Sequence, residues 1–220
     1  MKFFLDTADL DEIREAESWG VIAGVTTNPS LYAKIGGKLA DFEDHIARIC
    51  DIVSGPVSAE TTAMTRDEII EDGIRLAAIA PNVVVKIPVM AEGLAATHEL
   101  AKRGIAVNMT LVFSVPQAIM AARAGARYIS PFIGRFDDIG ENGLDQFSQI
   151  VDSVHAYDFG SDVEIIAASV RSSFHVTQSA LLGADIATVP FGVLKKCIEH
   201  PLTDRGLERL LADWKKVEQA

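Results

Sequence analysis

Val83–Pro88 reads VVVKIP, a run of β-branched residues that only Lys86 interrupts and that Pro88 ends. This composition predicts a buried strand over Val83–Ile87. Burial penalises the charged form of a lysine and favours the neutral amine, a nucleophile that condenses with a carbonyl to form a Schiff base. A strand-end lysine paired with a nearby carboxylate explains this segment equally well. The decision between the two depends on the rest of the chain.

Short β-rich runs alternate with amphipathic segments along the whole sequence. The predicted strands are Phe3–Asp6, Gly24–Thr27, Val57–Glu60, Val83–Ile87, Ala106–Thr110, Tyr128–Pro131, Glu164–Ala168 and Asp185–Val189. The predicted helices between them are Asp9–Trp19, Leu39–Val53, Thr65–Ala80, Glu92–Arg103, Pro116–Ala124, Gly143–Tyr157 and Ser173–Leu182. No Pro/Gly/Ser-rich linker divides this series, so it predicts βαβ units in one parallel sheet.

About eight strand–helix pairs favour an α/β fold in which residues 1–220 form a single (β/α)8 barrel domain. The alternative is an open doubly wound sheet, but neither the GxGxxG fingerprint nor the Walker A pattern is present. Two further helices are expected after the last strand, at Phe191–Glu199 and at about Leu202–Val217, with Pro201 between them. Apolar residues at helical spacing in the second indicate a core or interface stripe and suggest oligomerisation: Leu207, Leu210, Leu211, Trp214 and Val217.

The composition restricts the class of protein. Hydrophobic residues make up 49% and charged residues 23% of the 220 residues, which is ordinary for a soluble globular protein. The formal net charge of -11 argues against a general nucleic-acid binder. Anionic substrates remain compatible with it, because a few arginines can dominate the field of a small pocket.

The chain shows no pattern for export, membrane insertion or metal binding. Its start, MKFFLDTADLDE, reaches acidic residues too early for a secretory signal, and no apolar run approaches the roughly 20 residues of a membrane span. Cys50 and Cys197 form no CxxC pair, and the five histidines have no tight ligand spacing. We therefore expect a cytoplasmic protein with no disulfide framework, no metal site and no contact with membranes or nucleic acid.

Polar residues gather where the predicted strands end. A barrel brings these positions to one rim, where such enzymes place their chemistry: Asp6, Asn28, Glu60, Lys86, Asn108, Thr110, Ser130, Phe132, Ser169 and Arg171. Arg135 and Arg171, beside Ser169, are suited to hold a phosphate bidentately. Both arginines are equally well explained as surface ion-pair partners.

Some of these residues have simpler explanations. Asp6 fits a turn or helix cap, although Asp9 with Glu12 is a better capping pair and leaves Asp6 available for another role. Asn28-Pro29 fits an N-cap followed by proline at the first helical position. The acidic residues Asp137, Asp138 and Glu141 are interpreted as a solvated loop and cap, with magnesium binding as the lesser alternative.

Six motifs together resemble the transaldolase family. They are FLDTA (Phe4–Ala8), GVTTNPS (Gly24–Ser30), VVVKIP (Val83–Pro88), NMTLVFS (Asn108–Ser114), ISPFIGR (Ile129–Arg135) and AASVRS (Ala167–Ser172). They occur in the family's order, and the resemblance extends to Asp213–Val217. It is strongest to the short, probable-transaldolase branch, which neighbours the fructose-6-phosphate aldolases.

The resemblance implies a role for each matching residue. Lys86 corresponds to the Schiff-base lysine and Asp6 to the acid–base carboxylate, while Glu60 and Thr110 correspond to the pair that positions a catalytic water. The positions implied to bind substrate are Asn28, Asn108 and Ser130 for its hydroxyl groups, Phe132 in the pocket, and Arg135, Ser169 and Arg171 for its phosphate.

Two positions favour one branch of the family. The aldolase branch typically has glutamine at the position of Glu60 and tyrosine at that of Phe132. A phenol can orient water and assist its proton transfer, which favours release of free dihydroxyacetone, whereas phenylalanine cannot. Glutamate with phenylalanine is the transaldolase combination.

The resemblance thus implies a cofactor-independent transaldolase of the non-oxidative pentose phosphate pathway. It would transfer a dihydroxyacetone unit from fructose 6-phosphate or sedoheptulose 7-phosphate to erythrose 4-phosphate or glyceraldehyde 3-phosphate. Short relatives are commonly decamers of two pentamers, which implies a homo-oligomer here. The alternatives are a fructose-6-phosphate aldolase, a barrel lyase for deoxysugar phosphates, and a catalytically silent phosphosugar-binding barrel.

Overall fold

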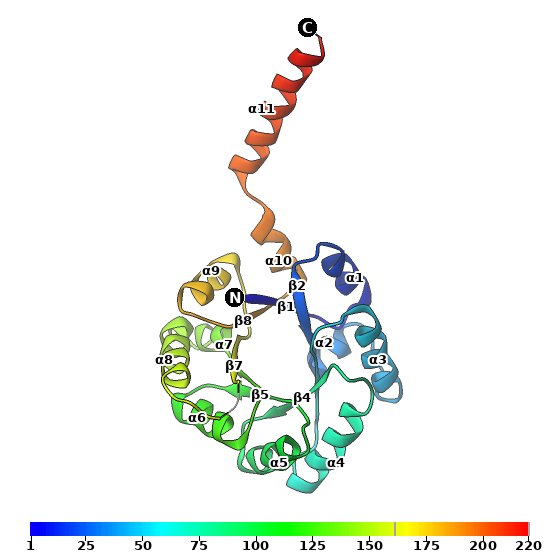
Figure 1. The fold of residues 1–220 in the computed structure, drawn as a ribbon, viewed down its shortest axis with the longest axis vertical. Coiled ribbons are helices and arrows are strands. Elements are labelled where there is room, and N and C mark those ends of the chain that lie inside the picture. The colour runs from blue at the N-terminus through cyan, green and yellow to red at the C-terminus, as the bar shows by residue number, and fades with distance from the viewer. Residues whose placement is uncertain (161, 220) are drawn as a thin grey trace.

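In residues 1–160 and 162–219, which the computed structural model describes, eight parallel strands close into a barrel (Figure 1). Each strand pairs with the next along the chain, and β8 pairs with β1. The strands are β1 (Lys2–Asp6), β2 (Ile22–Thr26), β3 (Val57–Glu60), β4 (Val83–Pro88), β5 (Val107–Val112), β6 (Tyr128–Pro131), β7 (Glu164–Ala167) and β8 (Ile186–Val189). This order confirms the (β/α)8 barrel and excludes the open sheet.

Helices surround the barrel, and the last of them projects away from it (Figure 1). They are α1 (Leu10–Ser18), α2 (Pro29–Lys34), α3 (Phe42–Ile52), α4 (Arg66–Ala77), α5 (Ala91–Lys102), α6 (Val115–Ala124), α7 (Ile133–Asp137), α8 (Gly143–His155), α9 (Ser173–Leu181), α10 (Phe191–Ile198) and α11 (Pro201–Glu218). The helix predicted over Leu39–Val53 is divided, because its first turn, Leu39–Asp41, is a 3-10 helix. The helix α7 was not predicted, since five residues are too few to show a helical period.

Two apolar layers stabilise the barrel. The larger layer lies between the strands and the helices, where the outward-facing strand residues such as Leu5, Val85 and Ile129 are fully buried. The smaller one fills the barrel interior and consists of Phe4, Val84, Tyr128, Ile166 and Ile186. Since side chains alternate along a strand, these two layers account for both faces of the sheet.

The interior layer also fixes which residues can form a site. Two positions beyond Phe4, Val84, Tyr128 and Ile186 on the same strands stand Asp6, Lys86, Ser130 and Thr188. Because side chains alternate between the two faces of a strand, these four also point into the barrel. They lie above the apolar layer, at the carboxyl ends of the strands.

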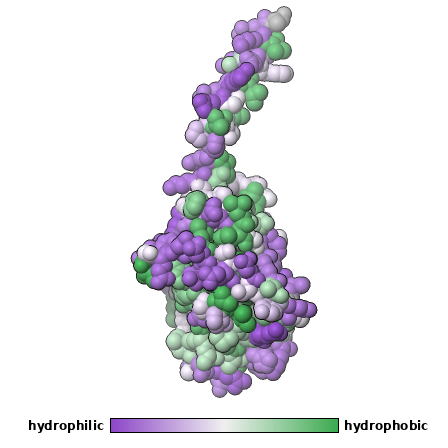
Figure 2. All heavy atoms as spheres, turned by 90° about the vertical axis from the view of Figure 1, so that its left-hand side faces the viewer, coloured by the Kyte–Doolittle hydropathy of each residue, from purple (hydrophilic) through white to green (hydrophobic). Residues whose placement is uncertain are grey.

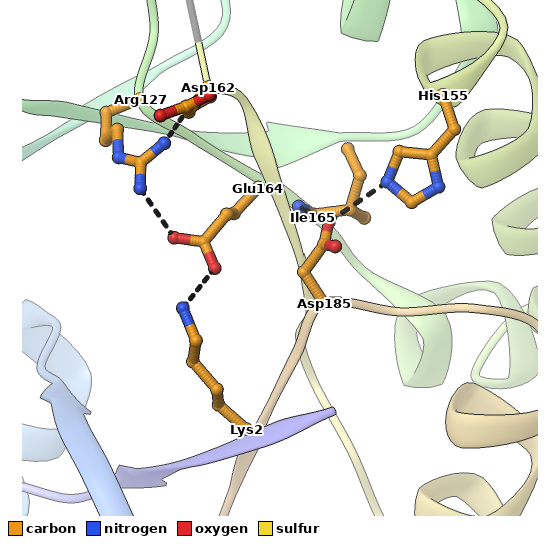
Figure 3. Close-up of polar contacts among 7 residues, drawn as sticks. All are labelled: Lys2, Arg127, His155, Asp162, Glu164, Ile165 and Asp185. Carbon is orange, nitrogen blue, oxygen red and sulfur yellow. Dashed lines mark hydrogen bonds and ion pairs between the residues drawn. The ribbon is translucent and has the colours of Figure 1, made fainter.

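The amino ends of the strands carry a different kind of contact (Figure 3). Glu164 accepts from Lys2 at 2.5 Å and from Arg127 at 3.0 Å, and Arg127 also donates to the carbonyl of Asp162. Asp185 accepts from the backbone N–H of Ile165 and lies 3.0 Å from Nε2 of His155. This network ties the starts of β1, β7 and β8 together at the end opposite the rim.

The last helix, α11, extends away from the barrel (Figure 1). It is about 27 Å long at 1.5 Å per residue, and every residue of it that the structure describes is exposed. Its apolar side chains lie in the open along the projecting helix (Figure 2), with Trp214 63% and Leu210 67% exposed. The predicted stripe is therefore not part of this chain's core. No helix in the described residues is both long and apolar enough to cross a membrane.

Candidate active site

A cavity of about 480 Å³ opens at the carboxyl ends of the strands. Its floor and walls come from all eight strands or the loops that follow them, and α2 and α7 contribute to its mouth. The predicted site residues that line it are Asp6, Asn28, Glu60, Lys86, Ser130, Phe132, Arg135, Ser169 and Arg171. The barrel thus brings these residues to one place, as the strand-end pattern predicted.

Lys86 lies at the bottom of the cavity and is 5% exposed. Its ammonium nitrogen is 2.9 Å from Oε2 of Glu60 and donates to the carbonyl of Thr27 at 3.1 Å. The strand register explains the first contact, because Glu60 on β3 is paired with Lys86 on β4. The lysine is therefore both buried at the cavity and paired with a carboxylate, which is the ion pair that the sequence left open as the alternative.

Asp6 is a second carboxyl group in the same cavity. Burial raises its pKa above the ordinary value, while the charge of Lys86 and a hydrogen bond from Thr26 act in the opposite direction. The Thr26 hydroxyl donates to Asp6 at 2.7 Å and lies 2.5 Å from the Thr188 hydroxyl. A carboxylate whose pKa is raised is a stronger base, so it is better suited to take a proton and later return it.

Asp9, and not Asp6, makes the helix cap that follows β1. Asp9 accepts from the backbone N–H groups of Asp11 and Glu12, so it is the N-cap of α1, as the sequence predicts. Glu12 does not complete the reciprocal half of a capping box, because it accepts instead from the Thr7 hydroxyl. Asp6 takes no part in this cap.

Asn108 and Thr110 are buried beside the cavity and are not among the residues that line it. Asn108, which is paired with Lys86 across β4 and β5, accepts from the Ser130 hydroxyl at 2.7 Å and donates to Ser58 at 3.1 Å. The Thr110 hydroxyl has no hydrogen-bond partner within the described part of the chain. A buried hydroxyl of this kind is able to hold a water molecule.

Asn28 begins the helix α2. Its Oδ1 accepts from the backbone N–H of Leu31 at 2.9 Å, and Pro29 occupies the first turn, so the predicted cap is present. The cap uses only the carbonyl oxygen of the side chain. The Nδ2 group is a separate donor on the same cavity-lining residue.

The two predicted phosphate-binding arginines lie exposed at the mouth of the cavity. Oδ2 of Asp138 is 2.8 Å from Arg171 and 3.9 Å from Arg135, so one carboxylate oxygen faces both guanidinium groups. Both arginines therefore make the surface ion pairs that their simpler explanation predicted, and the acidic run supplies the predicted cap, because Asp137 accepts from the N–H of Gly143. No cluster of His, Cys, Asp and Glu suited to a metal ion occurs in the described residues, so nothing favours the magnesium alternative.

Two residues at the cavity have an unusual backbone conformation. Leu111 has φ 56° and Ser169 has φ 58°, and both line the cavity. Non-glycine residues adopt this left-handed region rarely and at some cost, often at functional sites. The backbone around the cavity is therefore held in place by the closed barrel against its local preference.

Several residues of the cavity were not singled out by the sequence. Thr26, Lys34 and Thr188 line it, and Thr26 and Thr188 form the hydrogen-bond chain to Asp6. Thr26 occurs within the GVTTNPS motif and is paired with Asp6 across β1 and β2. The motif was the available sequence signal for Thr26, whereas no local pattern distinguishes Thr188 from any other polar residue near a strand end.

Comparison with known proteins identifies the family of this chain. The sequence profile described as Transaldolase/Fructose-6-phosphate aldolase matches residues 3–220. The chain belongs to this family. A probable transaldolase of Bacillus cereus is 55% identical over the whole of both chains. A probable transaldolase of Thermus thermophilus is 53% identical and aligns with 99% of this chain and 100% of its own.

These matches confirm the resemblance to the short probable-transaldolase branch, and they support an enzyme of the transaldolase type. Among solved structures, a thiamine phosphate pyrophosphorylase from Pyrococcus furiosus superimposes with a TM-score of 0.61 over 86% of this chain and 85% of its own. At 14% identity this likeness shows the shared barrel fold alone.

Proposed function

We propose that this family member is a transaldolase that carries a dihydroxyacetone unit as a Schiff base on Lys86. The donor is fructose 6-phosphate or sedoheptulose 7-phosphate, and the acceptor is erythrose 4-phosphate or glyceraldehyde 3-phosphate. The observation that carries the proposal is the buried Lys86 amine, in contact with Glu60 at the bottom of a cavity. A passive sugar-binding barrel has no need of such an amine.

Formation of the Schiff base begins with a proton transfer. Glu60 takes a proton from Lys86, and the neutral amine attacks the C2 carbonyl of the ketose phosphate. The resulting carbinolamine loses its hydroxyl group as water when Glu60 returns the proton, through a water held by Glu60 and Thr110. The iminium bond to Lys86 is then an electron sink next to C3.

Cleavage follows from the position of Asp6. The Asp6 carboxylate removes the proton of the C4 hydroxyl, the C3–C4 bond breaks, and its electron pair passes into the iminium group to give an enamine. The aldose phosphate leaves. In the second half the enamine attacks the acceptor aldehyde, Asp6 returns the proton to the new hydroxyl, and water releases the product ketose from Lys86. The iminium group supplies the electrophile, so the scheme requires no cofactor.

The remaining side chains bind the sugar. Asn28 and Ser130 contact its hydroxyl groups, and the buried Asn108 acts through Ser130, from whose hydroxyl it accepts a hydrogen bond. Arg135, Ser169 and Arg171 bind the phosphate at the mouth, where guanidinium groups suit its geometry. Phe132 lines the cavity without a group that could activate water. This favours retention of the enamine until an acceptor arrives, hence transfer over simple aldol cleavage.

A reductive trapping experiment tests the Schiff base. The protein is mixed with fructose 6-phosphate and sodium borohydride, and its peptides are mapped by mass spectrometry. We expect a dihydroxyacetone or ketose adduct on Lys86 and none in Lys86→Met. Lys34 is the internal control, because it lines the same cavity. An adduct on Lys34 alone, or no adduct at all, would refute the mechanism.

A second experiment separates transfer from cleavage. Turnover of fructose 6-phosphate is measured with and without erythrose 4-phosphate, and free dihydroxyacetone is quantified. We expect product formation to depend on the acceptor, with little free dihydroxyacetone. Equal release of dihydroxyacetone under both conditions would instead identify an aldolase.

The proposal also covers the oligomeric state of the protein and its location in the cell. Because α11 projects with an exposed apolar stripe, we propose that it packs against another copy of this chain in a homo-oligomer, a decamer of two pentamers by resemblance. We further propose that the enzyme acts in the cytoplasm, in the non-oxidative pentose phosphate pathway, where its proposed sugar phosphate substrates are interconverted.

A further inference from the structure

The phosphate-binding residues of the proposed site come from two separate segments. Arg135 lies on α7, while Ser169 and Arg171 lie in the loop between β7 and α9. Both arginine side chains are about half exposed or more, at 62% and 51%. Long exposed side chains lose entropy when they bind, so the affinity of such a pair depends on how firmly its two backbones are held together.

The first contact between the segments is made by the backbone. The N–H of Ile133 donates to the carbonyl of Ala168 at 2.9 Å, and the N–H of Gly134 donates to the carbonyl of Ser169 at 3.1 Å. A Cβ atom at Gly134 would lie 2.4 Å from that Ser169 oxygen and 2.6 Å from Nε of Arg171. The start of α7 therefore packs directly on the loop that carries Arg171.

The second contact is a buried histidine. His175, in the first turn of α9, is 9% exposed. Its Nδ1 accepts from the backbone N–H of Arg171 at 3.3 Å, so in the neutral ring the proton must reside on Nε2. Nε2 is 3.1 Å from Oδ2 of Asp137, and the other oxygen of Asp137 accepts from the N–H of Gly143. The ring thus joins the backbone of Arg171 to the end of α7.

Neither His175 nor Asp137 lines the cavity. Their contact cannot touch a substrate directly, and it does not stabilise the arginine side chains, which face Asp138. What it does fix is the separation between the helix that carries Arg135 and the loop that carries Arg171.

We propose that His175, through Asp137, is a positioning residue that sets the spacing of Arg135 and Arg171 and thereby makes the site selective for phosphorylated sugars. This inference rests on the proposed phosphate role of the two arginines. It assigns a task to a buried side chain that the mechanism itself does not use.

Two substitutions test separately the two contacts of the His175 ring, with the Arg171 N–H and with Asp137. His175→Asn keeps an acceptor near the place of Nδ1 for the Arg171 N–H but is too short to reach Asp137. His175→Gln reaches farther and keeps a donor toward Asp137. The matched control is His155→Asn, which breaks a similar His–Asp contact of 3.0 Å at the amino ends of the strands (Figure 3).

The measurements are kcat and KM with fructose 6-phosphate and with unphosphorylated fructose, and the dissociation constant of inorganic phosphate by calorimetry. For His175→Asn we expect KM for fructose 6-phosphate and the phosphate dissociation constant to rise about tenfold, the effect of losing one charge-assisted contact. We expect kcat to change less than about twofold, with no change for fructose. His175→Gln should recover most of the loss, and His155→Asn should match the parent.

Equal losses with fructose and fructose 6-phosphate, or unchanged phosphate binding in His175→Asn, would overturn the inference. If His175→Asn fails to fold, as judged by thermal unfolding, Asp137→Ala removes the same contact from α7 and must give the same phosphate-specific loss. The proposed function fails separately: a parent protein that traps no sugar on Lys86 refutes the mechanism. A parent that traps sugar normally while every variant binds phosphate like the parent refutes only the role of His175.

Discussion

At Asp6, folding and catalysis make opposite demands on one carboxyl group. Burial raises its pKa because the charged form loses its hydration, yet the proposed bond cleavage needs the charged form as a base. Lys86 and the Thr26 hydroxyl partly restore the ionised state. The pKa of Asp6 thus results from burial, which raises it, and from two contacts that lower it.

The first prediction concerns stability. The pKa of Asp6 is raised in the folded state above its ordinary value of 3.8, so the ionised group destabilises the fold once the pH exceeds both values. We expect Asp6→Asn to raise Tm at pH 7, because an amide still accepts from Thr26 and carries no charge. The gain should shrink as the pH falls and vanish below about 3.8. Activity should fall by a factor of about 10² or more.

Thermal unfolding followed by circular dichroism at several pH values measures this effect. Asp9→Asn is the control, because the substitution removes a carboxylate of similar sequence position but keeps the N-cap acceptor of α1. An unchanged or lower Tm for Asp6→Asn at pH 7 would contradict the claim that burial of the charge is costly.

The second prediction concerns the pH profile. The Thr26 hydroxyl donates to the ionised Asp6 and so lowers its pKa. We expect Thr26→Val, which has nearly the same shape, to raise this pKa and to move the acid limb of kcat/KM to higher pH. Thr177→Val on the exposed surface of α9 should leave the profile unchanged. If the acid limb of kcat/KM does not move in Thr26→Val, that limb does not reflect the ionisation of Asp6.

At the scale of elements, the short helix α7 has an influence beyond its five residues. It carries Arg135, its Asp137 contacts His175, and its Gly134 lies against the loop that carries Arg171. The absence of a Cβ at Gly134 is what permits this close approach. A helix too short to be stable alone is thus held by contacts with α9 and the end of β7.

We therefore expect Gly134→Ala to be destabilising. Overpacking costs about 1–3 kcal/mol, which corresponds to a Tm lower by about 2–12 °C for a domain of this size. Because Arg171 must move, KM for fructose 6-phosphate should also rise. Gly192→Ala in α10 is the matched control, since nothing lies within 4 Å of its added Cβ, and it should be neutral or slightly stabilising. Equal behaviour of the two variants would contradict the packing argument.

Helices and strands with a clear hydrophobic period could be predicted from the sequence, whereas elements without such a period were missed. The predicted strands, such as Val83–Ile87, agree with the observed strands to within one or two residues at their ends. They agree because the hydrophobic pattern, and Pro88 in this strand, define them locally. The residues at the rim could be predicted once a barrel was assumed, because a barrel brings the carboxyl ends of its strands together. The contact between Asp137 and His175 could not be predicted, because it joins segments that only the closed barrel brings together.

At the scale of the whole molecule, α11 is the part that the barrel does not explain. Its apolar residues follow one face of the helix, and in an isolated chain this face meets water. An 18-residue helix of this kind gains little stability without a partner surface. Assembly of copies through α11 supplies such a surface.

We expect substitution of the stripe to reduce the assembly while the barrel stays folded. Leu210→Glu with Trp214→Glu places charge on the apolar face, and light scattering should report a particle close to the 23.7 kDa of one chain. Arg209→Ala, on the opposite face of α11, is the control and should keep the parent mass. A double variant with the parent mass would show that α11 does not mediate association.

The ion-pair network of Lys2, Glu164 and Arg127 lies at the end of the barrel away from the cavity. None of these three residues lines the cavity, so substitutions at that end do not touch the proposed substrate site. A protein engineer could strengthen the amino-end contacts to prolong the working life of the catalyst, and independently reshape the rim to change which sugars it accepts.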